Sequence, residues 1–296
     1  MTEQTPKLAA GAAPGRPALK RQSLYVNVAD PGDPDLLFEN AETVADSHGP
    51  LPLLDYLYDF AREPKLPREA WTREALVSSC LEYLMEDFFY HTPSSSLTGM
   101  FDPEGLNDAV RALTSPRGMV ALAFHGGFGV NLIHFLAAFV DESLIIAPKA
   151  RPQFRSLSAK DPATTLFETL RALREGRTVC IAPDGEVGRP QGTIQLLGAD
   201  CAVNDGAAFL AYETGCDTAW SAMLRRGRLF APIVVPGPSR APGESYKGFR
   251  TRLMEFYRER IEAHFTGPPE NVAISKAWRR RLKAAMVRQA ALRGSV

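Results

Sequence analysis

Short apolar stretches alternate with helix-like stretches from residue 119 onward, and this alternation limits the fold more than any other feature. Each apolar stretch is rich in Val, Ile, Leu and Ala and is bounded by turn residues, which predicts strands over 119–124, 143–147, 178–182 and 230–235. Apolar residues at three- and four-residue spacing predict helices over 131–140, 163–174 and 206–214. Strands separated by helices of this length form a mainly parallel sheet covered on both faces. The sequence therefore predicts an α/β fold.

The part of the chain before residue 116 has a different character. Residues 1–22 are rich in Ala, Pro and Gly, and we expect a disordered arm there. Apolar periodicity within 51–90, broken at Pro64 and Pro67, predicts two amphipathic helices, and 103–114 predicts another. We therefore expect a helical part over 23–115 that packs on an α/β core over 116–296, with a basic helix at the end of the core.

Composition excludes several classes of function. Lys and Arg equal Asp and Glu at 34 each, so no overall charge attracts nucleic acid or an anionic membrane. The four cysteines form no CxxC pair, which argues against a zinc or redox motif and favours reduced thiols. No apolar run approaches the roughly 20 residues that span a bilayer, and the N-terminus lacks the apolar core of a secretory signal. We expect a cytoplasmic protein without a transmembrane segment, a metal or a bound nucleic acid.

His125 is the main catalytic candidate. It follows the strand predicted over 119–124 and opens the stretch His125-Gly-Gly-Phe-Gly-Val-Asn131, which leads into a helix. Open α/β proteins place their chemistry at this carboxyl edge of the sheet. We expect the flanking glycines to remove side chains from around the ring and let a substrate approach. The alternative is a histidine with a structural role at a strand end.

Two further loops follow predicted strands and reach the same edge. The loop over 183–190 carries Asp184, Glu186 and Arg189, although Asp-Gly is also common in ordinary turns. The loop over 147–155 carries Lys149, Arg151 and Arg155, which can hold a phosphate, sulfate or carboxylate or can form a solvated basic loop. We expect His125 and both loops to meet at one pocket, which would combine a base, acids and cations.

The order of these features resembles the lysophospholipid acyltransferase superfamily, and within it the lipid A biosynthesis (lauroyl) acyltransferase branch. Further points of resemblance are Gly192-Thr-Ile-Gln-Leu-Leu-Gly198, the helix start Asp205-Gly-Ala-Ala208, Thr214-Gly-Cys216 and the basic ending from Ser275 to Lys283. The resemblance covers about residues 50–290. It implies acyl transfer from acyl-CoA or an acyl carrier protein to a hydroxyl or amine, with the histidine as general base and no cofactor.

The chain departs from the family pattern at one catalytic position. The family has a carboxylate five residues after its histidine, but Val130 stands there, and the nearest polar side chain is that of Asn131. Asp184 or Glu186 could supply the missing acid. The resemblance assigns Asp184 to acceptor binding, which leaves Glu186 to reach His125. The lipid A branch also has an N-terminal membrane anchor, and its lack here favours a soluble or carrier-tethered substrate.

Two other functions remain open. The same fold could use its base to remove a proton during elimination or internal displacement of sulfate or phosphate on a carrier-bound amino acid, as in forming a small ring in a natural product. The chain could also be a non-catalytic binding subunit of a partner protein. Glu186 beside His125 would favour acyl transfer, whereas an anion held by Lys149 and Arg151 opposite His125 would favour displacement.

Overall fold

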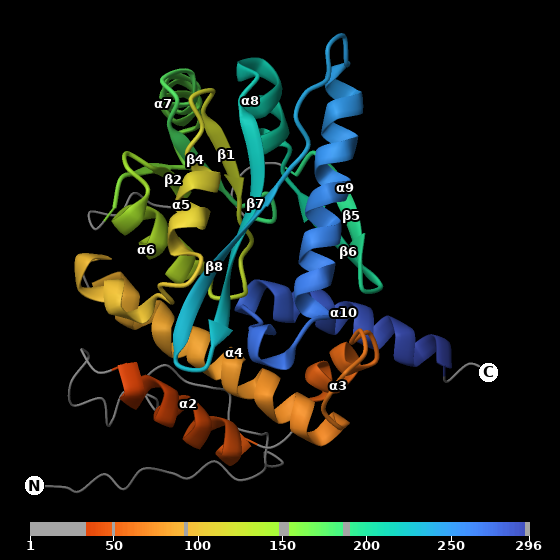
Figure 1. Ribbon diagram of the computed structural model, residues 1–296. Helices are drawn as coiled ribbons and strands as arrows, with labels where there is room; N and C mark the ends of the chain where they lie inside the picture. Colours follow the sequence, from red (N-terminus) through yellow and green to blue (C-terminus); the bar gives the residue numbers. More distant parts are fainter. Residues whose placement is uncertain (1–33, 49–50, 92–93, 148–153, 186–189, 294–296) are drawn as a thin grey trace, which may run out of the picture.

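The structure is a computed structural model that describes residues 34–48, 51–91, 94–147, 154–185 and 190–293 (Figure 1). Its centre is a six-stranded sheet in the order β3-β2-β4-β1-β7-β8, parallel except for β8, and β5 and β6 form a separate antiparallel hairpin. The strands are β1 Met119–Leu122, β2 Leu144–Ala147, β3 Ser156–Ser158, β4 Thr178–Ile181, β5 Gly192–Leu196, β6 Ala199–Val203, β7 Asp217–Arg226 and β8 Leu229–Pro236. The predicted α/β fold with a mainly parallel sheet is confirmed.

Helices cover the sheet on both faces. The chain passes from β1 through α6 to β2, toward the β3 edge of the sheet, whereas the connections through α7 to β4 and through α8 to β7 run toward the β8 edge. Because crossovers between parallel strands are right-handed, α6 lies on one face of the sheet and α7 and α8 lie on the other. The helices are α2 Pro34–His48, α3 Pro52–Tyr58, α4 Arg68–His91, α5 Leu106–Leu113, α6 Gly129–Phe139, α7 Pro162–Arg174, α8 Gly206–Thr214, α9 Tyr246–Phe265 and α10 Lys276–Arg293, with short 3-10 turns η1 Ser94–Met100 and η2 Pro269–Asn271.

The register of the parallel strands brings their carboxyl ends level. Leu122 of β1 pairs with Ile181 of β4, and Ile145 of β2 pairs with Cys180 one residue earlier on β4. The chain therefore leaves β1, β2 and β4 at the same edge, as the sequence predicted. The helix α4 lies across this end of the molecule (Figure 1) and packs against α6 and η2.

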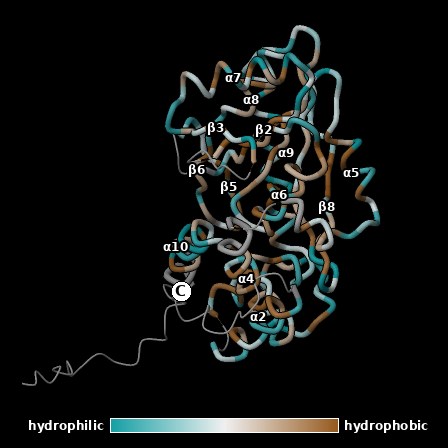
Figure 2. Tube along the Cα trace, turned by 90° about the vertical axis from the view of Figure 1, so that its left-hand side faces the viewer, coloured by the Kyte–Doolittle hydropathy of each residue, from teal (hydrophilic) through white to brown (hydrophobic). Residues whose placement is uncertain are grey.

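The C-terminal helix α10 carries both hydrophilic and hydrophobic residues (Figure 2). Its buried residues are Trp278, Leu282 and Ala285, and they hold it against the rest of the structure. None of the helices in the described part of the chain combines the length and the apolar character that a membrane crossing needs. The arm expected over residues 1–22 lies outside the described residues.

Four features gave no signal in the sequence: α2, the short strand β3, β7 and the β5–β6 hairpin. The strand β7 contains several small residues, and seven of its ten residues are buried without the alternation that marks a half-exposed strand. The hairpin turns at Leu197 and Gly198, whose φ angles are 48° and 74°. Two positive φ angles match a type I′ turn, which Asn-Gly usually marks, so the Leu-Gly turn gave no clear signal.

Candidate active site

A cavity of about 530 Å³ opens where β1, β2 and β4 end, and His125 lies in its wall. The other described residues that line it come from the strand ends, from α7 and α8, and from the start of α9: Ile146, Ala147, Ala159, Pro162, Thr165, Leu166, Thr169, Ile181, Ala182, Gly185, Gln191, Asn204, Asp205, Gly206, Phe209, Leu210 and Tyr246. Ala147 and Gly185 begin the two loops that we expected to meet His125, so the described ends of both loops reach one cavity.

The two glycines after His125 do not face the cavity. Gly126 and Gly127 are both buried. A Cβ on Gly126 would lie 2.9 Å from the Phe124 ring, and a Cβ on Gly127, whose φ is +57°, would overlap Nε2 of His264. The expectation that these glycines clear space for a substrate is therefore wrong. They let the backbone turn tightly against Phe124 and His264, which leaves the His125 side chain 43% exposed beside the cavity.

Asp184 supplies the carboxylate that the chain lacks five residues after His125. Its side chain is fully buried, and its Oδ1 lies 3.2 Å from Nδ1 of His125. The backbone N–H of His125 also donates to Oδ2 of Asp184 at 3.0 Å. Because both the ring and the backbone of His125 contact the same carboxylate, Asp184 sets where the imidazole lies.

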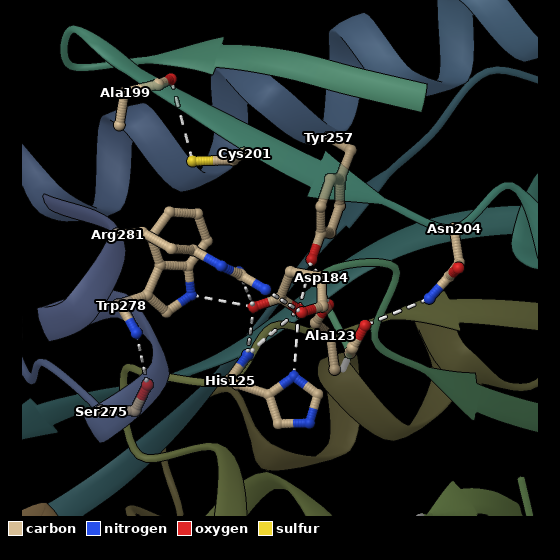
Figure 3. Close-up of polar contacts among 11 residues, drawn as sticks. Ala123, His125, Asp184, Ala199, Cys201, Asn204, Tyr257, Ser275, Trp278 and Arg281 are labelled. Atoms are coloured by element: carbon tan, nitrogen blue, oxygen red, sulfur yellow. Dashed lines mark hydrogen bonds and ion pairs between the residues drawn. The ribbon is translucent and has the colours of Figure 1, made fainter. Parts of the chain in front are cut away.

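Three side chains from the last two helices complete the surroundings of Asp184 (Figure 3). The Tyr257 hydroxyl lies 2.9 Å from Oδ1 of Asp184 and 3.0 Å from the carbonyl oxygen of Ala123. Nε1 of Trp278 donates to Oδ2 at 2.8 Å. Arg281 donates to the Asp184 carbonyl oxygen at 2.7 Å, and its guanidinium lies 3.6 Å from Oδ2.

These contacts keep Asp184 ionised in a dry environment. Burial by itself raises the pKa of Asp184, but the hydrogen bonds and charge of His125 and the Tyr257 hydroxyl outweigh it and bring the pKa below its usual value. Burial and the neighbouring carboxylate raise the pKa of Tyr257 well above its usual value, so Tyr257 stays protonated and donates. An ionised Asp184 can only accept, so Nδ1 of His125 carries the proton and Nε2 is the basic nitrogen.

The structure changes the roles expected for two of the predicted site residues. Asp184 has no exposed surface, so the prediction that it binds the acceptor is wrong, and it contacts His125 instead. Asn131 is buried, does not line the cavity and donates to the Met85 sulfur at 3.9 Å, a position that does not fit the predicted catalytic role.

The remaining predicted residues lie at or beyond the limits of the described chain. Arg155 is exposed, and its carbonyl oxygen accepts from the backbone of Ile145, but its side chain is not part of the cavity wall. Lys149, Arg151, Glu186 and Arg189 lie outside the described residues, so their predicted roles in binding an anion or in reaching His125 stay predictions.

Sequence reasoning missed Tyr257, Trp278 and Arg281. Tyr257 lies among the apolar positions of a predicted helix, so its sequence pattern is the same as that of a residue that only fills the core. Trp278 stands alone as an aromatic in the basic segment Ser275-Lys-Ala-Trp-Arg-Arg-Arg281, which is the one available hint that this segment turns a side chain inward.

Other kinds of centre find no support among the described residues. No group of three or more His, Cys, Asp and Glu side chains in the described ranges is arranged to hold a metal ion. Burial raises the pKa of Cys180 to about 12 and that of Cys80 to about 12, so both thiols stay protonated and are poor nucleophiles.

Comparison with known proteins adds no assignment. No protein-family model matches this chain, and a search of curated proteins finds no match.

Proposed function

We propose that this protein is an acyltransferase that uses His125 as a general base and Asp184 as the carboxylate that orients it. The observation that carries the proposal is the hydrogen-bonded pair of His125 and a fully buried Asp184 at the wall of a largely apolar cavity. The acyltransferase family has an acid five residues after its histidine, and this chain has Val130 there. In the proposal, Asp184 takes the place of that acid.

The proposed step needs no group beyond the two substrates. Nε2 of His125 removes the proton from a hydroxyl or amine of the acceptor, and the acceptor oxygen or nitrogen attacks the thioester carbonyl of the donor. The carbon–sulfur bond breaks, and the thiolate takes the proton back from the imidazolium. Asp184 stabilises the imidazolium while it exists and holds the ring in the required tautomer.

The cavity supports an acyl group as one of the ligands. Its volume lies in the range of about 300–1,000 Å³ that is usual for small-molecule sites. The hydroxyls of Thr165 and Thr169 donate to backbone carbonyl oxygens, which lowers the polarity of the α7 wall. Leu166 and Phe209 line the cavity and are also exposed, at 41% and 37%, so apolar surface extends from the cavity to its mouth. An acyl chain buried there would be stabilised by about 0.8 kcal/mol per methylene.

The test is an assay for transfer from decanoyl-CoA, and from a decanoyl carrier protein, to a panel of alcohols and amines, followed by mass spectrometry and by release of free thiol. We expect Asp184→Asn to lower turnover by about 10⁴, as in hydrolases where the same change imposes the wrong histidine tautomer, and His125→Gln to lower it at least as far. Asp108→Asn and His48→Gln serve as matched controls, because both residues lie outside the cavity wall.

Three results would overturn the proposal. Turnover that survives His125→Gln would remove the histidine from the mechanism. Release of sulfate or phosphate from a carrier-bound amino acid without thiol release would favour the displacement reaction instead. Substrate binding without any turnover by the wild-type protein would favour a non-catalytic subunit.

A further inference from the structure

One wall of the cavity is polar, and neither the pair of His125 and Asp184 nor the apolar acyl site involves it. It is formed by Gln191, Asp205 and Tyr246, which we call the polar wall. Gln191 precedes β5, Asp205 precedes α8 and Tyr246 is the first residue of α9, so three separate elements bring these side chains together. Gly185 lies between the polar wall and His125. A Cβ added to Gly185 would lie 3.5 Å from Cε1 of His125, and the Gly185 carbonyl oxygen accepts from the side chain of Asn204, the residue before Asp205.

Neighbouring groups hold the Asp205 carboxylate in place through one of its two oxygens. Oδ2 accepts from the Tyr246 hydroxyl at 2.9 Å and lies 3.0 Å from Nε of Arg250. The Asp205 backbone N–H donates to the side-chain oxygen of Gln191 at 3.3 Å. Arg250 in turn donates to the backbone carbonyl oxygen of Gln191. These contacts give the carboxylate a defined orientation at the cavity.

The other oxygen is available to a ligand. Within the described part of the chain, Oδ1 of Asp205 accepts no hydrogen bond, although the side chain is only 19% exposed. Burial and the bond to Asp205 raise the pKa of Tyr246 to about 12, so its proton stays on the side facing Asp205 and its oxygen lone pairs remain acceptors. Asp205 and Tyr246 therefore present acceptor atoms to the cavity, beside the amide N–H groups of Gln191, whose side-chain oxygen already accepts from Asp205.

We propose that the polar wall is the subsite for the acyl acceptor and that it receives a group bearing N–H or O–H donors, an amine or a hydroxyl, and not an anionic group. This assignment rests on the proposed function for the identity of the ligand as the acceptor. A carboxylate or phosphate placed against Asp205 would face Oδ1 of Asp205 and the Tyr246 oxygen, whose proton goes to Asp205, and within the polar wall only the Gln191 amide could donate to it. His125 and the polar wall line the same cavity, which suits the acceptor, because the base must reach the proton that it removes.

The test measures binding by calorimetry and needs no turnover. The probes are decylamine, decanol and decanoate, which share one chain length and differ in their head groups. We expect the wild-type protein to bind decylamine or decanol at least about tenfold more tightly than decanoate, the size of one charge-assisted hydrogen bond. Asp205→Asn should weaken the preferred probe about tenfold, and it should bind decanoate no more weakly than the wild type or more tightly, because the repelling carboxylate is gone.

Two further variants test whether the loss of affinity comes from the polar wall itself. Tyr246→Phe keeps the ring beside Phe209 and Tyr212 and removes only the hydroxyl, so it should show a smaller loss in the same direction. Asp108→Asn is the control for removing a carboxylate, because Asp108 is 80% exposed on α5 and pairs with Arg111. Melting temperatures of all variants show whether each one is folded.

Each outcome decides the inference. A larger loss for decylamine than for decanol in Asp205→Asn identifies an amine acceptor, and equal losses identify a hydroxyl. Decanoate binding as tightly as the other two probes, or affinities that neither Asp205→Asn nor Tyr246→Phe changes, would overturn the subsite. A chain that shows the expected head-group preference but transfers no acyl group would contradict the proposed function alone.

Discussion

Gly127 shows how one residue can set the position of a candidate catalytic group. It has a φ of +57° and lies against the buried ring of His264, so a side chain is excluded both by the backbone conformation and by space. The following residue, Phe128, also has a positive φ, of 58°, and is fully buried. This tight turn brings the chain from the end of β1 into α6 and leaves His125 as the residue that faces the cavity.

Gly127→Ala should therefore cost more than the usual replacement of a glycine with positive φ. We expect a loss of about 3 kcal/mol in the free energy of unfolding, from left-handed backbone strain and overpacking against His264. The matched control is Gly105→Ala, because Gly105 has a φ of +77° and nothing within 4 Å of its added Cβ, so only strain of about 1 kcal/mol applies. Urea denaturation measures both, and equal losses would show that His264 gives way without cost.

At the scale of elements, α9 and α10 complete a candidate site whose central residues, His125 and Asp184, follow β1 and β4. Tyr257 of α9 and Trp278 of α10 both donate to Asp184, one to each carboxylate oxygen. Trp278 also packs edge to face on Phe265 of α9, with ring centroids 5.3 Å apart. The C-terminal helix is therefore a positioning element for the carboxylate that orients His125.

Trp278→Phe tests this role, because it removes the N–H donor and keeps an aromatic ring. We expect the free energy of unfolding to fall by about 1–3 kcal/mol, the usual result of removing a partner from a buried polar group. Turnover in the acyl-transfer assay should fall while KM stays the same, since Trp278 does not line the cavity. Val287→Ala on the same helix, at an exposed position, should change neither quantity. A change in KM alone would contradict the positioning role.

At the scale of the whole molecule, two buried titratable groups, His264 and Asp184, link stability to pH. Burial lowers the pKa of His264 from 6.5 to about 4, so the folded protein holds this ring neutral beside Phe124. The pKa of Asp184 is also lowered, so Asp184 stabilises the fold above its usual pKa and loses that contribution as the pH falls through its folded pKa.

The effect of His264 has a defined direction and window. Below pH 6.5 the unfolded chain takes up a proton that the folded chain accepts only near pH 4, so stability falls as the pH drops between these values. The shift corresponds to about 3 kcal/mol. Denaturation measured at pH 7.5, 5.5 and 4.5 should show this fall, and His264→Gln should flatten it. His48→Gln should leave the slope unchanged, and an unchanged slope in His264→Gln would assign the effect to other groups.

The amino-acid sequence by itself determined the α/β class, the strands β1, β2, β4 and β8, most of the helices, and the place of His125 at a strand end. These follow from periodicity and turn residues within short windows, where each stretch reports its own burial. The convergence of the chain segments after β1, β2 and β4 also followed, because parallel strands joined by right-handed crossovers end at one edge.

Only the tertiary structure decided which carboxylate serves His125 and which side chains hold that carboxylate. Asp184 lies 59 residues after His125, and its partners Tyr257 and Trp278 lie 73 and 94 residues further along the chain. Contacts over such separations depend on how whole helices pack, and a tyrosine or tryptophan that serves a buried acid has the same local pattern as one that only fills the core. The same reason explains Gly126 and Gly127, whose neighbours Ala273 and His264 are distant in sequence and define the turn only once the chain has folded.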